Sequence, residues 1–523
     1  MTFDILIKDG TILDGSGQPR FRGDVGISSG AIAAVGNPAL EGAEAPKVID
    51  AAGKFVSPGF VDITSHADTS GALLLNPHQG YLLTQGVTSI LGGNCGASLA
   101  PIASPEAVGA LSKWGFGSAA NVNWLTFGKF LDELSKQPLG VNFGTLVGHD
   151  TLRRGILRGE SRVMTPEELE QFRELLSRSL DEGAFGLSTG LVYGHEAPAT
   201  AAELTAMSRV LAAKGTIYKT HLRSEGANLL AAVNEAIQIS RESGASIIIS
   251  HLKAIGRKSW PFFGRALEMI GRTAEDGVKV HFDLSPYRRT GSFLYLLLPA
   301  WAREGGFNVM LERLRKPEHR SAIIGELKSA TLHFDRYIVA SPQGGGRTIA
   351  ELAELSTSPP EEVMLNLLAA SRGRAIVLGR TVSFPNIVTG IRHPLAVVAS
   401  DGTGVMAEAD RAGVLVHPRS TGCFPHFLHM FVREKEIVSW EEGIHKITSR
   451  PAELVGFKGR GRIAPKFAAD IVVFDPEQIR DRSTYQNPYV HPIGIEAVIV
   501  NGKLAVENGQ LTGTAAGEVL KKA

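Results

Sequence analysis

Apolar runs recur along the middle of the chain and alternate with helical patterns. Eight such runs begin at positions 55, 86, 140, 183, 216, 245, 278 and 395. Between them, apolar residues recur every three or four positions, as in residues 165–183, where Thr165 and Pro166 provide an N-cap and a first-turn residue. Continuous apolar runs are typical of parallel strands buried on both faces. Eight alternations of strand and helix therefore predict an α/β fold, a (β/α)8 TIM-type barrel over residues 58–459.

The two ends of the chain have a different pattern. Residues 1–57 and 460–523 contain short β-rich runs separated by glycine-bearing turns, and Asn501-Gly502 is typical of a type I′ hairpin. We expect these ends to form one small β-sandwich domain together. Residues 288–394, before the last barrel strand, are too many for one helix, which predicts a small, mostly helical insertion within the barrel.

Polar groups suited to chemistry follow many of the apolar runs. In such barrels, the active site lies at the carboxyl ends of the strands. The groups found there are Asp62, His66, Cys95, His221, His251 and Asp401. One histidine after a strand is usually structural, but this many groups at the same end of successive strands are hard to explain by chance. A thiolate and two imidazoles suit Zn²⁺ with an open fourth position, where a bound water would become nucleophilic near neutral pH.

Several of these segments also match motifs of a known family. The chain resembles the N-acyl-D-amino-acid deacylases (D-aminoacylases) of the amidohydrolase superfamily nearly from end to end. The motifs that carry the resemblance are PGFVD at 58–62, GGNCG at 92–96, THLR at 220–223, SHLK at 250–253, SDG at 400–402 and HPR at 417–419. The resemblance implies zinc-dependent hydrolysis of an amide bond, most simply that of an N-acyl-D-amino acid. A cyclic amide or a larger amide-linked substrate is the alternative.

The resemblance also implies roles for individual residues. Cys95, His221 and His251 would hold a tightly bound zinc ion, and Asp401 would be the general base and then the general acid. The substrate carboxylate would be held by Lys253, Tyr287, Ser292 and Arg419. The guanidinium of Arg419 suits this role because it pairs with a carboxylate through two parallel hydrogen bonds.

The chain departs from the family at one metal-binding position. The family carries His-x-His after the first strand, whereas this chain has Thr64-Ser65-His66. In relatives that histidine pair, with the cysteine and the aspartate, forms a second and weaker metal site. A threonine hydroxyl is a poor zinc ligand beside an imidazole. We therefore expect one tightly bound zinc ion, and a second site at His66 and Asp401 that is empty or weakly filled.

Composition limits the partners and the compartment. The 54 basic and 53 acidic residues nearly cancel, so charge gives no reason to expect nucleic acid or an anionic membrane as a partner. No apolar run is long enough to span a membrane, and the first residues lack a signal-peptide pattern. With only two cysteines, a disulfide framework is not expected, and we predict a cytoplasmic protein acting on a small amide.

Other interpretations of single residues compete with these. Gly186–Gly190 matches the nucleophile elbow of serine hydrolases around Ser188, but glycine and proline follow where its helix should begin. A non-catalytic scaffold that has lost a ligand at Thr64 is a further alternative. His149 is expected to make a structural hydrogen bond, Cys423 to pack in the core, and Asp68 to serve either the metal site or a turn.

Overall fold

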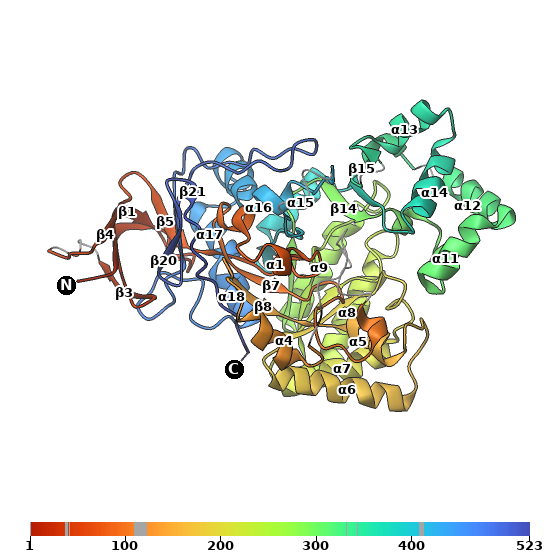
Figure 1. The fold of residues 1–523 in the computed structure, drawn as a ribbon, viewed down its shortest axis with the longest axis horizontal. Helices are drawn as coiled ribbons and strands as arrows, with labels where there is room; N and C mark the ends of the chain where they lie inside the picture. The colour runs from red at the N-terminus through yellow and green to blue at the C-terminus, as the bar shows by residue number, and fades with distance from the viewer. Residues whose placement is uncertain are drawn as a thin grey trace.

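The computed structural model describes residues 2–36, 40, 42–108, 122, 124–330, 332–341, 344–406 and 413–522. Its centre is a parallel barrel, with a sheet made by both chain ends on one side and a helical lobe on the other (Figure 1). The barrel strands are β6 (Phe60–Asp62), β7 (Val87–Gly92), β8 (Asn142–Thr145), β9 (Val147–Gly148), β10 (Gly186–Gly190), β11 (Ile217–His221), β12 (Ser246–Ile249), β13 (Val280–Leu284) and β17 (Ala396–Val398). All eight apolar runs of the sequence contribute strands, and the predicted fold class is confirmed.

Hydrogen bonds close this barrel between its last and first strands. Strands β6, β7 and β8 pair in parallel, Leu146 alone separates β8 from β9, and β9 continues in parallel through β10, β11, β12, β13 and β17. From β17, the Ser400 amide donates to Asp62 Oδ1 at 3.0 Å. The His66 amide donates to the Gly402 carbonyl at 2.9 Å. These contacts place the strand-end residues of the first and last strands side by side.

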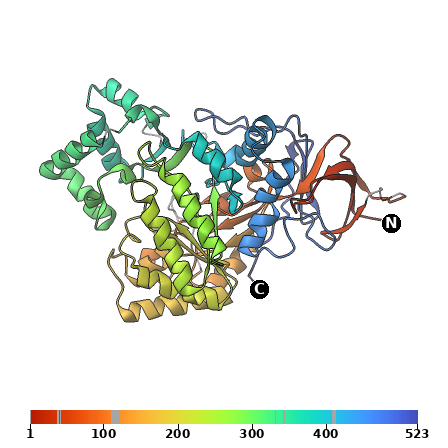
Figure 2. The same ribbon diagram turned by 180° about the vertical axis from the view of Figure 1, so that it is seen from behind.

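Helices surround the barrel, and Figure 2 shows the yellow-green ones lying across it. The covering helices are α4 (Phe127–Leu134), α5 (His149–Ile156), α6 (Pro166–Asp181), α7 (Ala201–Ala213), α8 (Leu229–Ser243), α9 (Phe262–Glu275), α15 (Phe384–Arg392), α16 (Arg419–Phe427), α17 (Trp440–Ile447) and α18 (Ser449–Val455). Helix α6 begins with the predicted Thr165 N-cap, whose side chain forms a capping box with Glu168. Short helices α1 (Ala72–Leu75) and α2 (Gly80–Leu83) lie between β6 and β7 in sequence.

The two chain ends build one nine-stranded sheet. Its strands are β1 (Ile5–Ile12), β2 (Phe21–Ser28), β3 (Ala31–Gly36), β4 (Lys47–Asp50), β5 (Phe55–Pro58), β18 (Ile471–Phe474), β19 (Ile495–Val500), β20 (Lys503–Glu507) and β21 (Gln510–Leu511). Strands β5 and β18 join the halves by antiparallel pairing. Asn501 and Gly502 connect β19 to β20 with φ of 46° and 75°, the two positive values that a type I′ turn requires. Apolar side chains from both ends, such as Ile7 and Ile471, share one core.

The segment before the last barrel strand is a lobe with its own apolar core. Its helices are α10 (Ala300–Arg303), α11 (Gly306–Arg315), α12 (Pro317–Ser329), α13 (Ile349–Ser356) and α14 (Pro360–Ala370). A three-stranded antiparallel sheet accompanies them, formed by β14 (Arg289–Phe293), β15 (Tyr337–Val339) and β16 (Ile376–Arg380). The sequence pattern did not reveal this sheet. Among the described residues, no helix is both long and apolar enough to cross a membrane.

Candidate metal centre and active site

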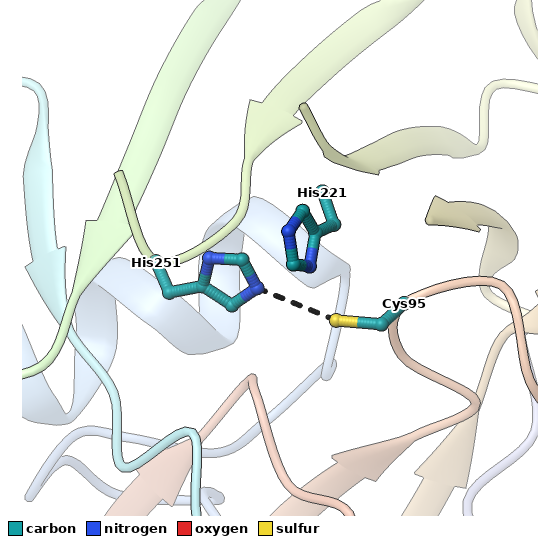
Figure 3. Close-up of side chains that lie close together, drawn as sticks. All are labelled: Cys95, His221 and His251. Atoms are coloured by element: carbon teal, nitrogen blue, oxygen red, sulfur yellow. Dashed lines mark hydrogen bonds between the residues drawn. The ribbon is translucent and has the colours of Figure 1, made fainter. Parts of the chain in front are cut away.

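Cys95, His221 and His251 converge at the carboxyl ends of three barrel strands (Figure 3). Cys95 follows β7, His221 ends β11 and His251 follows β12. One ligand atom from each lies within 4.8 Å of the others, and Cys95 Sγ is 3.4 Å from His251 Nε2. All three side chains are buried. A thiolate and two imidazoles at this spacing fit a tetrahedral zinc ion that keeps one position open.

The electrostatics of this cluster favour a bound cation. Burial alone would raise the pKa of the Cys95 thiol, but the positive charges of His251 and His66 outweigh burial and hold that pKa well below its usual range. Burial and the Lys253 ammonium lower the pKa of His251, yet the negative charges of Asp401 and Cys95 raise it to about 10. Burial lowers the pKa of His221, which keeps that imidazole neutral as a metal ligand must be. The negative charge that holds a proton on His251 can hold a divalent ion in its place.

Backbone conformation at the site is unusual for the residue types present. Cys95, His251 and Asp401 have φ of 53°, 36° and 53°, in the left-handed region that favours glycine. Each follows a strand, and the left-handed residue turns the chain sharply where the strand ends. Such strain costs of order 1–3 kcal/mol per residue and collects at functional sites. Here it falls on two candidate ligands and the candidate base.

Asp401 lies between a guanidinium and an imidazole. Arg419 Nη1 is 2.8 Å from Asp401 Oδ2, and His66 Nε2 is 3.3 Å from Asp401 Oδ1. Burial would raise the pKa of Asp401, but the Arg419 charge, followed by those of His251 and His66, holds it well below its usual range. The carboxylate is therefore ionised.

Two cavities that share residues open at this end of the barrel. The larger, about 270 Å³, is lined by Cys95, His221, His251, Lys253, Ser292 and Asp401 among others. The smaller is lined by His251, Lys253, Tyr287, Asp401 and Arg419 among others. Within the described part of the chain, the buried Tyr287 hydroxyl has no hydrogen-bond partner. The predicted substrate groups thus lie around the predicted metal ligands, while His66 is buried behind them, 3.8 Å from Cys95 Sγ.

Glu225 is a site residue that the sequence analysis missed. Its Oε1 is 3.1 Å from His251 Nδ1 and accepts a hydrogen bond from Lys253 Nζ at 2.6 Å. Burial would raise the pKa of Glu225, but Lys253 and the two histidines hold it far below its usual range. A carboxylate on the outer nitrogen of a metal-binding histidine fixes the ring and increases its basicity. The available signal was an acid four residues after His221, in a loop where spacing defines no common face.

Comparison with known proteins now decides the family. A profile of the amidohydrolase family matches residues 47–506. The chain belongs to this family. The D-aminoacylase of Alcaligenes xylosoxydans xylosoxydans is 32% identical to this amidohydrolase over 522 residues, covering 99% of this chain and 98% of that protein. The N-acyl-D-glutamate deacylase of the same organism is 32% identical over 504 residues, covering 95% and 93%. The resemblance predicted from the sequence motifs is confirmed.

Solved structures agree with these relatives. A D-aminoacylase studied for its binuclear metal centre, described as having one-metal activation and second-metal attenuation, superposes with a TM-score of 0.84 at 29% identity, covering 99% of this chain and all of that one. The N-acyl-D-glutamate deacylase of Bordetella bronchiseptica, solved with zinc and a phosphonate mimic of the tetrahedral intermediate, has the same TM-score and identity over the whole of both chains. The likeness of this amidohydrolase to both includes the barrel and the flanking regions.

The serine-hydrolase alternative does not fit this amidohydrolase. Ser188 is fully buried, donates a hydrogen bond to the Gly93 carbonyl, and accepts one from the Gly96 amide at 3.0 Å. A nucleophile must reach the cavity and a general base. Ser188 instead fixes the loop that carries Cys95. Asp68 has a similar role, since its Oδ2 accepts a hydrogen bond from the Gly93 amide at 2.7 Å.

Proposed function

We propose that this amidohydrolase hydrolyses the amide bond of an N-acyl-D-amino acid, releasing a carboxylate and a free amino acid. The observation that carries the proposal is the convergence of Cys95, His221 and His251 beside Asp401 at the mouth of a cavity. The two relatives named above support it, since one is a D-aminoacylase and the other an N-acyl-D-glutamate deacylase. Zinc, when bound by the three ligands, would supply Lewis-acid activation of water and of the substrate carbonyl.

The protein's own residues would manage proton transfer. Asp401 is ionised and borders both cavities, so it can take a proton from the attacking water and pass it to the leaving amine. The ion pair with Arg419 holds the Asp401 carboxylate in place. Glu225 keeps His251 Nδ1 engaged, which leaves Nε2 directed at the ligand cluster.

Four further residues would bind the substrate carboxylate. Lys253, Tyr287, Ser292 and Arg419 line the two joined cavities. Lys253 and Arg419 are paired with Glu225 and Asp401 in this structure. A substrate carboxylate would therefore join existing ion pairs, and the Tyr287 hydroxyl is available to donate to it.

We place the reaction in the cytoplasm, because both cysteines are buried thiols, which fits a reducing compartment.

A hydrolysis screen tests this function. The panel contains N-acetyl and N-formyl derivatives of D- and L-amino acids, a cyclic amide and unrelated aryl amides. We expect turnover of N-acyl-D-amino acids, loss of turnover with a chelator, and recovery with Zn²⁺. Asp401→Asn should lower kcat by about 10²–10⁴-fold, the usual contribution of a general acid–base group. Turnover restricted to the cyclic or aryl amides, or chelator-resistant activity, would contradict the proposal.

A further inference from the structure

A lysine ammonium lies inside the barrel beside the metal centre. Lys219 is in β11, two residues before His221, and its side chain is fully buried. Its Nζ donates hydrogen bonds to Thr64 Oγ1 at 2.7 Å and to Ser250 Oγ at 3.0 Å, and it forms an ion pair with Asp283 Oδ2 at 2.9 Å. The ammonium thus has two hydroxyl acceptors and one carboxylate counter-ion. A buried charge persists only when it is paired and hydrogen-bonded in this way.

The ammonium is connected to the metal ligands through its partners. Asp283 uses its other oxygen, Oδ1, to accept a hydrogen bond from the His251 amide at 2.8 Å. Ser250, the second partner, directly precedes His251 in the chain. Lys219 therefore supports the left-handed turn at which His251 enters the site. Replacing it would leave the Asp283 carboxylate buried without its cation.

The third partner, Thr64, stands at the position that the sequence resemblance aligns with the first histidine of the family's His-x-His pair. The other groups of the second metal site remain together, since His66 Nε2 is 3.3 Å from Asp401 Oδ1 and 3.8 Å from Cys95 Sγ. At position 64, however, the hydroxyl is already engaged by Lys219. A divalent ion held through a side chain at this position would lie within a few ångströms of a fixed positive charge, where repulsion in a low-dielectric interior is strong. The residues present therefore do not fit a second metal ion.

We propose that Lys219 is a built-in cation that takes the place of the second metal ion and limits this protein to one divalent ion per chain. Thr64 and Lys219 act as a pair, because the short hydroxyl leaves room for the ammonium and accepts its hydrogen bond. The inference rests on the proposed function, since it presupposes the first metal site at Cys95, His221 and His251.

Metal stoichiometry tests the proposal without relying on activity. Each purified protein is equilibrated with excess Zn²⁺, freed of unbound metal by gel filtration, and analysed by inductively coupled plasma mass spectrometry. The wild type should hold one zinc ion per chain. Thr64→His alone should also hold one, because the ammonium remains. The triple variant Thr64→His, Lys219→Met, Asp283→Asn supplies the missing imidazole and removes the buried ion pair as a unit, and it should hold two.

The matched control is Lys219→Met with Asp283→Asn, which keeps Thr64 and should hold one zinc ion. The proposal would be overturned if the triple variant is folded by circular dichroism and still holds only one zinc ion. A wild type that holds two would overturn it as well. A wild type that holds none would instead refute the first metal site, so the two failures are distinguishable.

A second measurement applies if the triple variant does not fold. The metal-free wild type is titrated with Co²⁺, and its visible absorption is followed. Saturation of the absorption and of bound cobalt at one equivalent is expected. Continued stoichiometric binding up to two equivalents would show that the ammonium does not exclude a second ion.

Discussion

Two buried histidine clusters lie near each other in this barrel, and they differ in what the imidazoles face. His149 is bonded on both ring nitrogens, with Nδ1 2.9 Å from Glu196 Oε1 and Nε2 2.9 Å from Glu203 Oε1. Arg153 also contacts Glu203. His251 Nδ1 lies 3.1 Å from Glu225 Oε1 and 2.9 Å from Lys253 Nζ, while its Nε2 faces the Cys95 sulfur at 3.4 Å and no carboxylate lies within hydrogen-bond distance of Nε2 among the described residues. The first cluster compensates its own charges, whereas the second leaves ligand atoms directed at a common point.

The difference shows which features distinguish a metal site from a structural charge cluster. A metal needs the lone pair of one ring nitrogen, and the other nitrogen is then free to be oriented by a carboxylate. An imidazole with a carboxylate on each side has no such lone pair available and is held as a charged group. The pKa of His149 is accordingly raised, because hydrogen bonds and negative charge from Glu196 and Glu203 outweigh burial. His149 therefore serves structure, as the sequence analysis expected.

The largest effect is expected from removal of the Cys95 thiolate, which belongs to the His251 cluster and not to the His149 cluster. Cys95→Ala takes away one of the three proposed ligands, and zinc affinity should fall by more than about 100-fold, the upper end of what loss of an outer-shell partner costs. After dialysis, neither bound zinc nor hydrolytic activity should be detectable, while the circular dichroism spectrum should remain that of the wild type. The matched control is Cys423→Ala, a buried thiol outside the ligand cluster, which should keep its zinc. Equal zinc content in both variants would contradict the ligand assignment.

The sequence predicted the part of the site that follows strand ends. Parallel strands read as apolar runs, so the position of Cys95, His221, His251 and Asp401 relative to each run could be deduced from the chain alone. The Asp401 carboxylate and Arg419 were both singled out, yet their direct contact was not, because a spacing of 18 residues in the sequence does not fix a distance in space.

Groups that depend on long-range contacts could not be predicted. Lys219 occupies a strand position whose partners come from three other strands or their ends, at Thr64, Ser250 and Asp283. Nothing local to Lys219 distinguishes an interior ammonium from a rim residue. The sheet of the helical lobe was missed for the same reason, since β14 pairs with β16 across about ninety intervening positions, from Arg289 to Arg380.

The cluster around His149 should make the stability of the fold depend on pH in the acid range. Burial would raise the pKa of Glu203, but the hydrogen bond and charge of His149 and the charge of Arg153 outweigh it and lower the pKa to about 2. A carboxyl with a depressed folded-state pKa stabilises the fold at pH above its unfolded value. That contribution, on the order of 3 kcal/mol, is lost as pH falls from about 4.5 toward 2.

The melting temperature should therefore decrease on acidification less steeply in Glu203→Gln than in the wild type. Both proteins should carry Cys95→Ala, so that metal release does not contribute to the pH dependence. Glu170→Gln, which removes an exposed ion pair with Arg173, should melt with the wild-type pH profile. Parallel pH profiles for Glu203→Gln and the wild type would show that the cluster does not stabilise the fold through charge.

The smallest effect is expected from a change at Glu225, the carboxylate beside His251. Glu225→Gln keeps the side-chain volume but removes the charge that faces His251 Nδ1 at 3.1 Å and Lys253 Nζ at 2.6 Å. Because outer-shell partners tune the basicity and orientation of the ligand, zinc affinity should fall by about 10–100-fold. Activity should then be lost at low zinc and recovered when zinc is added, as measured by titration against a competing chelator.

Glu235→Gln provides the matched control for this change. Glu235 pairs with Arg223, two residues before Glu225, but it contacts no metal ligand in the described residues, with the Arg223 Nη2 to Glu235 Oε1 distance at 2.9 Å. Its zinc affinity should remain within about twofold of the wild type, because an ion pair outside the ligand shell contributes little to the metal site. If Glu225→Gln also bound zinc with wild-type affinity, the charge of Glu225 would not contribute to metal binding. The number of carboxylates around a histidine would then not distinguish a metal ligand from a structural histidine.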